Sequence, residues 1–327
     1  MNAVITSFGS YLPERVLTNE DLEKMVETSD EWIFTRTGIR ERRLASSEES
    51  TASMGAEAAK DALKKNDLLA TDIDAIIVCS MTHDYFCPST ASIIQKELGA
   101  TKAACIDIQA ACAGYLYGLS IAKAWVESKA FNKVLLIATE KNSSFIDFED
   151  RTTCVLFGDG AGASIIQNTG PGYSIRSISL GADGNGNNAI IIPAGGSKQP
   201  ASHETVDKHL HSIKMSGKET FYHAVKRMAE ASLECMKKEG ISKRDIAFLV
   251  SHQANIRIIE ATAKRLNLEK EKVISTIHKY GNTSSSTIPI ALDELEHEKR
   301  VGHNDLLLLT AFGGGFSWGA TILEKVE

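Results

Sequence analysis

Short apolar runs rich in β-branched residues alternate along the chain with segments whose apolar residues recur every three or four positions. The first pattern is typical of buried strands, and the second of amphipathic helices. The expected strands are 75–79, 104–108, 133–138, 161–166, 246–250, 306–310 and 319–323. The expected helices are 19–26, 51–66, 89–98, 114–128, 217–239, 256–266 and 287–298. This alternation predicts an α/β fold with buried mixed sheets, and helix 217–239 is long enough to lie between two of them.

Two pairs of similar segments indicate an internal duplication. The segment LKKNDLLATDIDAIIVCS (63–80) resembles MKKEGISKRDIAFLVSH (236–252), and GDGAGASIIQ (158–167) resembles GGGFSWGATILE (313–324). Two related halves would explain both pairs, although αβ units of unrelated proteins also look alike. The turn-forming residues Gly170-Pro171-Gly172 suggest the boundary. We therefore expect an N-terminal half at 1–170 and a C-terminal half at 171–327.

Composition and charge narrow the class of protein. The 327 residues are enough for about two domains. There are 36 basic and 42 acidic side chains, and the net charge of −6 argues against a general binder of nucleic-acid backbones. No apolar run approaches the ~18 residues that span a bilayer, and the N-terminus lacks the pattern of a signal peptide. We expect a cytoplasmic protein that binds neither nucleic acid nor membrane.

The cysteine and glycine patterns exclude several kinds of site. The six cysteines are scattered, with no CxxC pair and no Cys/His cluster at zinc spacing. We therefore expect reduced thiols and no bound metal. Neither GxGxxG nor GxxxxGK[ST] occurs, so the common nucleotide-phosphate loops are absent from the sequence.

Cys112 is the first residue with candidate chemistry. It follows strand 104–108 and the small residues Ala110 and Ala111, and it precedes helix 114–128. A cysteine at a helix N-terminus gains from the helix dipole, which can lower a thiol pKa from ~8.5 into the ~3.5–7.5 range. The alternative is a small buried apolar residue, which is what most free cysteines are. The pattern makes Cys112 a candidate nucleophile.

Two further residues are candidates because of their positions after a strand and in a turn. His252 comes directly after strand 246–250, and open α/β sheets build their sites at the carboxyl ends of strands. It is a candidate general base or oxyanion donor, with a capping or core histidine as the alternative. Asn282 lies in a Gly/Ser/Thr-rich turn, where its amide could donate to a developing oxyanion. The alternative there is an ordinary turn and N-cap.

The segment FGGGFSWG (312–319) supplies glycines that would let backbone N–H groups approach a ligand. A papain-like Cys–His–Asn hydrolase is another interpretation of these residues. Its cysteine normally lies in a CGSCW context, whereas this chain has CAGY, and no GxSxG elbow is present. The constellation therefore favours a site of another type.

At these residues the sequence resembles the thiolase-superfamily condensing enzymes, and specifically the β-ketoacyl-acyl-carrier-protein synthase III family. The similar segments are SFGSYLPERVLTN (7–19), SDEWIFTRTGIRERR (29–43), AACAGYLYGLS (110–120), DRTTCVLFGDGAGA (150–163), SHQANIRII (251–259), YGNTSSSTIP (280–289) and FGGGFSWGA (312–320). The resemblance implies a thiolase-like duplicated αβαβα layered fold with two mixed five-stranded sheets around buried helices. It also implies a homodimer.

The resemblance implies a reaction as well. An acyl-CoA primer, with acetyl-CoA expected, would condense with malonyl-acyl-carrier protein to give 3-oxoacyl-acyl-carrier protein, CoA and CO₂, initiating fatty acid biosynthesis. Cys112 would attack the acyl-CoA, and the N–H groups of Cys112 and Gly314 would form the oxyanion hole. His252 and Asn282 would donate hydrogen bonds to the malonyl thioester carbonyl. Neither a metal nor a redox cofactor would be needed.

The same resemblance assigns binding residues. Those expected to contact CoA and its pantetheine arm are Thr28, Trp32, Arg36, Arg151, Gly217, Phe221, Asn255 and Ile258. Gln253 and Arg257 would contact the carrier protein. Cys87 would enter the acyl pocket of the partner subunit where several relatives carry Phe, so a longer or branched primer could fit. Lys218 and Tyr222 stand where Asn and Lys are expected, which leaves the carrier contact open to change.

Two alternatives to this function remain at the level of sequence. One is a relative that makes secondary metabolites or a β-ketoacyl-CoA, which dependence on the carrier protein would distinguish. The other is a non-catalytic binding module with the thiolase fold. That module predicts a broken Cys–His–Asn set, whereas Cys112, His252 and Asn282 are all present.

Overall fold

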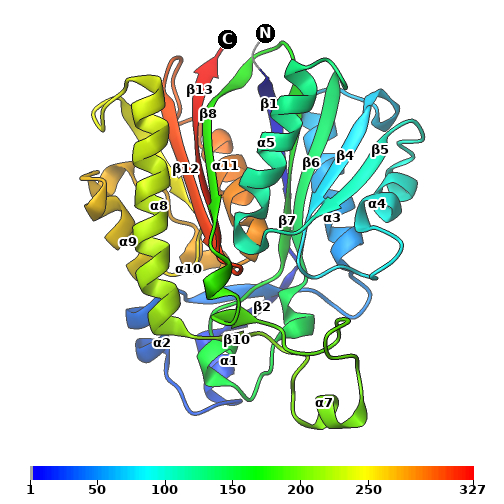
Figure 1. The fold of residues 1–327 in the computed structure, drawn as a ribbon, viewed down its shortest axis with the longest axis vertical. Helices are drawn as coiled ribbons and strands as arrows, with labels where there is room; N and C mark the ends of the chain where they lie inside the picture. Colours follow the sequence, from blue (N-terminus) through cyan, green and yellow to red (C-terminus); the bar gives the residue numbers. More distant parts are fainter. Residues whose placement is uncertain (1–2) are drawn as a thin grey trace.

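The computed structural model describes residues 3–327 and is built around a nine-stranded mixed sheet (Figure 1). The strand order is β11-β12-β13-β8-β1-β7-β6-β4-β5. The bounds are β1 Val4–Tyr11, β4 Ala75–Cys79, β5 Ala104–Ile108, β6 Lys133–Glu140, β7 Gly160–Gln167, β8 Gly172–Ala182, β11 Ile246–Ser251, β12 Leu306–Gly313 and β13 Ser317–Val326. The predicted α/β class is confirmed.

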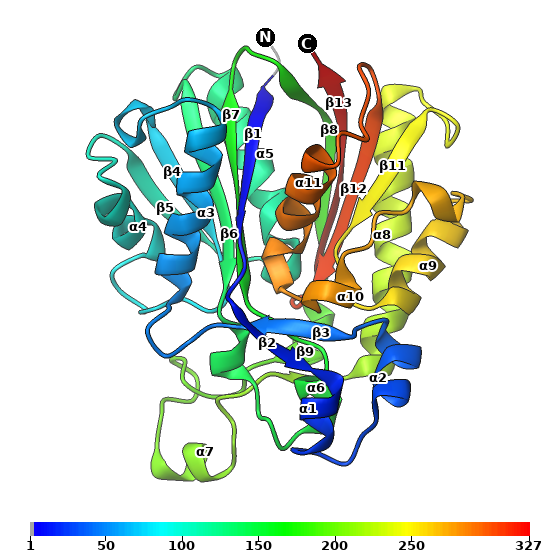
Figure 2. The same ribbon diagram turned by 180° about the vertical axis from the view of Figure 1, so that it is seen from behind.

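The prediction of two separate five-stranded sheets was wrong in the number of sheets and strands, because the structure has one nine-stranded sheet. Strand β1 pairs with β8 through Val4↔Ser174 and Ile5↔Tyr173, and these two pairs join the halves into one sheet. Below this junction the half-sheets diverge (Figure 2). One half has five strands and the other four, because the fifth strand of the second half is reduced to a bridge between Leu249 and Val273.

The two half-sheets repeat one pairing scheme. β4 pairs in parallel with β5 and β6, and β6–β7 and β7–β1 are antiparallel. In the other half β11 pairs in parallel with β12 and bridges in parallel to Val273, whereas β12–β13 and β13–β8 are antiparallel. Such agreement is what a duplicated chain would show. A boundary between the halves near residue 170 stays a prediction.

Helices form three layers around the half-sheets (Figures 1 and 2). The pair α5 (Gly114–Glu127) and α11 (Thr287–His297) lies between them, and α5 contacts strands of both halves. On the outer faces lie α3 (Thr51–Lys65) and α4 (Thr90–Leu98) at one side, and α8 (Gly217–Glu239) and α9 (Ile256–Arg265) at the other.

Helix α8 therefore lies on an outer face, and the prediction that it sits between two sheets was wrong. It carries Lys218, Glu219, Lys226, Arg227, Glu230, Glu234, Lys237, Lys238 and Glu239, and charged side chains need water. Helix α5 has only Lys123 and Glu127 and can be buried on more than one side. Length alone did not distinguish the two positions, but charge does.

The carboxyl ends of β4, β5, β6, β11 and β12 point toward the same end of the molecule (Figures 1 and 2). Shorter elements gather there: β2 Arg15–Thr18, α1 Asn19–Glu23, α2 Asp30–Thr37, β3 Glu41–Leu44, α6 Arg151–Cys154, β9 Ile190–Ile191, α7 His203–Asp207, β10 Lys214–Met215 and α10 Ile277–Tyr280. This end therefore holds the residues that follow the parallel strands. Among residues 3–327, no helix combines the length and apolarity needed to cross a bilayer.

Candidate active site

A strained turn places Cys112 at the start of helix α5. Strand β5 ends at Ile108, and residues Ala111–Ala113 form one 3-10 turn before the helix begins at Gly114. Ala111 has φ +44°, a left-handed value that non-glycine residues seldom adopt and that is often found at functional sites. The turn leaves Cys112 only 9% exposed, at the end of the sheet where the short elements gather.

The glycine segment after β12 packs directly against this turn. A Cβ atom on Gly313 would lie 2.6 Å from the backbone nitrogen of Cys112, so only glycine fits there. The Ser317 hydroxyl donates to the Ala110 carbonyl at 2.8 Å and fixes the same approach. Gly314 consequently lines the same cavity as Cys112. Sequence reasoning selected Gly314 but missed Gly313, although both lie in the glycine motif.

His252 follows β11 and is held from two sides. Its backbone N–H donates to the Thr310 carbonyl at 2.8 Å, and its ring Nδ1 lies 2.7 Å from the Thr287 hydroxyl. The residue is 2% exposed. Burial lowers the pKa of His252 to about 3, because the charged imidazolium loses its hydration. The ring is therefore neutral at physiological pH.

Asn282 is fixed by its backbone and by its own amide. Its N–H donates to the Leu156 carbonyl at 2.9 Å, and its carbonyl accepts from the Gly158 N–H at 3.0 Å. The side-chain Oδ1 accepts from the Ser284 N–H at 2.8 Å. Since Oδ1 is occupied in this way, the NH₂ end of the amide is left to face a ligand.

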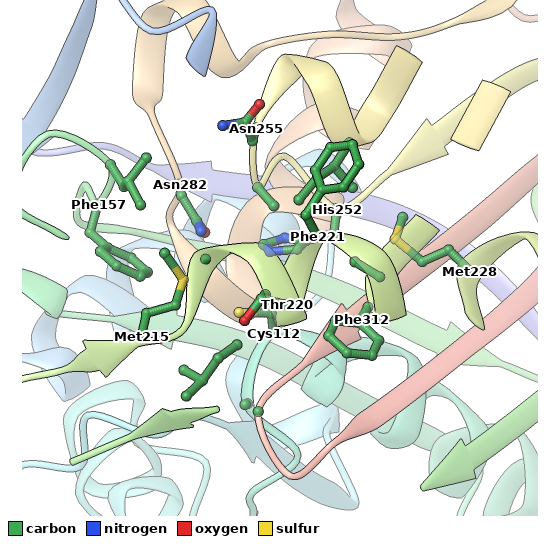
Figure 3. Close-up of a pocket in the computed structure, with 18 of the residues that line it drawn as sticks. Cys112, Phe157, Met215, Thr220, Phe221, Met228, His252, Asn255, Asn282 and Phe312 are labelled. Atoms are coloured by element: carbon green, nitrogen blue, oxygen red, sulfur yellow. The ribbon is translucent and has the colours of Figure 1, made fainter. Parts of the chain in front are cut away.

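Cys112, His252, Asn282 and Gly314 all line one cavity (Figure 3). The Asn282 amide and the His252 ring reach into it near the Cys112 sulfur (Figure 3). Four predicted pantetheine contacts also line it, namely Gly217, Phe221, Asn255 and Ile258. Most other lining side chains are apolar, including Met81, Leu156, Phe157, Met215, Met228 and Phe312, and the sequence analysis assigned a role to none of them. An apolar cavity with a few convergent polar groups suits an acyl chain with one reactive carbonyl.

The Cys112 thiol differs electrostatically from the sequence-based expectation. Burial, with a further contribution from the charge of Glu140, raises the pKa of Cys112 to about 12, although the Ser284 hydroxyl at 3.5 Å lowers it. The raised value arises from loss of hydration and from the Glu140 charge, and a lowering by the helix N-terminus stays a prediction. The thiol is therefore protonated at neutral pH, and its attack on a carbonyl requires a proton acceptor.

Three of the predicted CoA contacts form a separate cluster outside the cavity. The guanidinium carbons of Arg36 and Arg151 lie 4.9 Å and 5.1 Å from the centre of the Trp32 ring. Arg151 also donates to the Glu27 carbonyl at 2.7 Å. Nearby in sequence, the Thr28 hydroxyl oxygen is buried without a hydrogen-bond partner among the described residues. The structure thus offers an aromatic ring flanked by two cations.

The predicted carrier-protein contacts divide into two cases. Gln253 is 1% exposed, and its amide bonds the Ser251 and Ile274 carbonyls and the Thr276 N–H. It cannot reach a partner protein, so its expected contact is corrected to a structural role. Arg257 is exposed on α9, and Lys218 and Tyr222 are exposed on the first turns of α8.

Cys87 is exposed to solvent in the isolated chain, and the neighbouring side chains of Tyr85 and Phe86 are 63% and 90% exposed. Cys87 does not line the cavity of Cys112 within this chain. Its predicted place in the acyl pocket of a partner subunit stays a prediction.

Comparison with known proteins gives one consistent family. Residues 106–184 match the family described as 3-oxoacyl-[acyl-carrier-protein] synthase III, and residues 236–325 match its C-terminal family. A beta-ketoacyl-[acyl-carrier-protein] synthase III of Chlamydia pneumoniae is 53% identical, with 99% of this chain and 97% of the relative covered. One from Caldanaerobacter subterraneus is 49% identical over 98% of this chain and 97% of the relative.

Solved structures agree with these sequence matches. The crystal structure of 3-oxoacyl-[acyl-carrier-protein] synthase III from Aquifex aeolicus has a TM-score of 0.91 at 43% identity, covering 98% of this chain and 99% of that one. The structure from Pseudomonas aeruginosa has a TM-score of 0.92 at 33% identity, covering 100% and 99%. The thiolase-like layered fold predicted from the resemblance is confirmed, apart from the sheet count.

The neutral state of His252 is directly measurable. Because burial lowers its pKa to about 3, the ring should keep the chemical shifts of neutral imidazole from pH 8 down to pH 5. NMR spectra of protein with isotope-labelled histidine would show this, and His252→Gln would identify the signal. A titration midpoint near the ordinary ~6.5 would contradict the buried, neutral ring.

Proposed function

Because the chain belongs to the β-ketoacyl-acyl-carrier-protein synthase III family, we propose that Cys112, His252 and Asn282 carry out the family's condensation in the cavity described above. The protein is an acyltransferase that condenses an acyl-CoA with malonyl-acyl-carrier protein to start fatty acid synthesis. The products are 3-oxoacyl-acyl-carrier protein, CoA and CO₂. The observation that supports the residue roles is the convergence of a thiol, a neutral imidazole and an amide on one apolar cavity.

The first half of the reaction is acyl transfer to the enzyme. The Cys112 sulfur attacks the thioester carbonyl of the acyl-CoA, a tetrahedral oxyanion forms, and CoA leaves. The backbone N–H groups of Cys112 and Gly314 stabilise that oxyanion, and the close fit of Gly313 holds the two segments together.

The second half is decarboxylation and carbon–carbon bond formation. The His252 Nε2–H and the Asn282 NH₂ donate to the malonyl thioester carbonyl, which stabilises the enolate formed when CO₂ departs. A neutral ring that donates from Nε2 must accept at Nδ1, so the Thr287 hydroxyl at 2.7 Å would turn its one proton to the ring and away from the Ser284 carbonyl at 3.0 Å. The enolate then attacks the acyl group on Cys112. These steps use only side chains and backbone groups of this chain.

The roles of the three residues can be separated kinetically. Cys112→Ser should lose acyl-enzyme formation, because a hydroxyl is a far weaker nucleophile than a thiolate. His252→Ala and Asn282→Ala should each slow CO₂ release from malonyl-carrier protein by roughly 10²–10³-fold, the usual loss for one oxyanion donor, and should affect acyl transfer less. Rapid-quench acylation and ¹⁴CO₂ release measure the two steps. Equal losses in both steps for all three variants would contradict the division of roles.

Two surface groups are proposed to receive the substrates. The Trp32 ring, with Arg36 and Arg151 beside it, is suited to the adenine and phosphates of CoA by stacking and cation–π contact. Thr28 lies four residues before Trp32, and its hydroxyl has no hydrogen-bond partner among the described residues. The exposed Arg257 of α9 is suited to an acidic carrier protein.

Variants of Arg151 and Arg257 should act as controls for each other. Arg151→Ala should raise the KM for acyl-CoA by removing the cation beside Trp32, with little change in the KM for malonyl-carrier protein. Arg257→Glu should do the reverse, because it places a like charge against the carrier. Steady-state kinetics with each substrate varied in turn measures both. If both variants change the same KM, the assignment of separate surfaces is wrong.

The enzyme is further proposed to be a homodimer that works in the cytoplasm. Strand β5 is an edge strand with Ile106 39% exposed, and Tyr85 and Phe86 expose large apolar surfaces on the loop that carries Cys87. Unpaired edges and clustered apolar side chains are commonly covered by a partner. A second copy would place Cys87 near the partner's acyl pocket. The cytoplasmic location rests on the sequence alone.

A charge at the exposed apolar loop should separate the subunits. Phe86→Asp is expected to lower the mass in solution from dimer to monomer, since an unpaired carboxylate would be buried at the interface. Leu69→Asp, at an apolar side chain that is 71% exposed elsewhere on the surface, should leave the mass unchanged. Sedimentation equilibrium measures both, and a monomeric unmodified protein would overturn the dimer.

A further inference from the structure

A fully buried carboxylate lies behind the reacting sulfur, and none of the steps above uses it. Glu140 ends strand β6 and is 0% exposed. Its Oε2 accepts from the Thr82 hydroxyl at 2.8 Å, the Met81 N–H at 3.1 Å and the Ser80 hydroxyl at 3.2 Å. Its Oε1 accepts from the hydroxyls of Ser285 at 2.7 Å and Ser284 at 3.2 Å. Four hydroxyls and one backbone N–H lie within hydrogen-bond distance of this group, and each can donate to an ionised carboxylate.

The carboxylate has no cationic partner. Within residues 3–327, no lysine, arginine or histidine forms an ion pair with Glu140, so neutral donors alone stabilise its charge. Burial raises the pKa of Glu140 above its ordinary value despite these hydrogen bonds. A buried anion of this kind is a better proton acceptor than a solvated one.

Ser284 connects this carboxylate to the nucleophile. Its hydroxyl lies 3.5 Å from the Cys112 sulfur and 3.2 Å from Glu140 Oε1. A serine hydroxyl has one proton, and that proton is directed to the carboxylate. Either atom of the Cys112–Ser284 contact can donate, and while the Ser284 proton is directed to Glu140 the Cys112 S–H is placed to donate to the Ser284 oxygen. In the part of the chain that the structure describes, no other side chain hydrogen-bonds to this sulfur.

We propose that Glu140 and Ser284 form a proton relay that activates Cys112 for acyl transfer. The proposal rests on the acyl-transfer role of Cys112 proposed above. As the sulfur attacks the thioester, the S–H proton moves to the Ser284 oxygen and the Ser284 proton moves to Glu140 Oε1. When the C–S bond to CoA breaks, the proton on Ser284 moves to the leaving CoA sulfur and the proton on Glu140 returns to the Ser284 oxygen. The negative charge therefore moves from Glu140 to the tetrahedral oxyanion and back, and no net proton is gained or lost.

The other titratable groups near the sulfur are less suited to this task. The His252 ring is a weak proton acceptor, because burial holds its pKa far below the usual range. Cys79 does not line the cavity, and burial raises the pKa of its thiol well above the ordinary value. Transfer to Glu140 only moves an existing buried charge, whereas transfer to His252 would create two new ones.

A purely electrostatic role for Glu140 predicts the opposite behaviour. Its negative charge contributes to the high pKa of Cys112, so removing the charge without a relay would make the thiolate easier to form. Under that alternative, Glu140→Gln acylates faster than the unmodified enzyme at neutral pH. Under the relay it acylates more slowly. The direction of the change therefore separates the two roles.

The test is the pH dependence of single-turnover acylation by radiolabelled acetyl-CoA. The unmodified enzyme should show a rate that is nearly constant from pH 7 to 9, because the relay takes the thiol proton without exchange with solvent. Glu140→Gln and Ser284→Ala should lose roughly 10²–10⁴-fold at pH 7, the usual contribution of general base catalysis. Their rates should then rise about tenfold per pH unit, as the thiol must ionise to solvent.

Matched variants separate the relay from a structural effect. Ser285→Ala removes a hydrogen bond to the same Oε1 but none to Cys112, and it should keep the flat profile. Ser284→Gly also lacks the hydroxyl, and glycine suits the φ of +54° at this position, so it should match Ser284→Ala if that variant folds poorly. Thermal unfolding of each variant shows whether the fold is retained.

The outcomes are distinguishable. If the unmodified enzyme fails to acylate with a panel of acyl-CoA primers, the acyl-transfer role of Cys112 fails, and the relay fails with it. If it acylates but Glu140→Gln, Ser284→Ala and Ser284→Gly keep its rate and flat profile, or if Glu140→Gln is faster at pH 7, the relay alone is overturned. A steep profile confined to the Glu140 and Ser284 variants would establish it.

Discussion

The loss of hydration around the Cys112 sulfur is the constraint on which the rest of the site depends. The sulfur lies at the end of a β5 turn, covered by the segment after β12 and by the loop that carries Asn282. In such an environment a charge is stable only where fixed donors surround it. The thiol is therefore protonated, the His252 ring is neutral, and the Glu140 carboxylate is enclosed by five donors.

This arrangement suits two different reactions at one sulfur. Acyl transfer needs a thiolate for a short time, and decarboxylation needs hydrogen-bond donors that are not themselves charged. A protonated imidazole would hold the malonyl carboxylate in place and oppose its departure, whereas a neutral ring stabilises only the developing enolate. The cavity's apolar lining also keeps water away from the enolate and the acyl-enzyme.

Sequence patterns singled out Cys112, His252 and Asn282, which the structure brings to one cavity, and their roles stay a prediction. Cys112, His252 and Asn282 each lie next to a short apolar strand or a glycine-rich turn, and both patterns are readable without structure. Strands β1 and β8 were missed because polar and small residues interrupt them, and their pairing is what joins the half-sheets. Most other predicted strands and helices agree with the structure within a few residues.

The electrostatic environment of the site residues could not be predicted from the sequence as well as their positions along the chain. Gln253 lies between His252 and Asn255, which both have a proposed role, yet its amide is hydrogen-bonded to backbone groups. Glu140 had one readable signal, a single acid at the end of the apolar strand VLLIATE, but its five donors come from segments around residues 80 and 284. The position of Cys112 before a helix was visible in the sequence, and the burial that raises the pKa of its thiol was not.

The central claim is that Cys112 carries the acyl group. Peptide mapping by mass spectrometry, after brief exposure of the enzyme to an acyl-CoA and acid quench, locates the adduct residue by residue. We expect a single acyl group on the peptide around Cys112, removed by neutral hydroxylamine as a thioester should be. An adduct on another residue, or a hydroxylamine-resistant ester, would contradict the account.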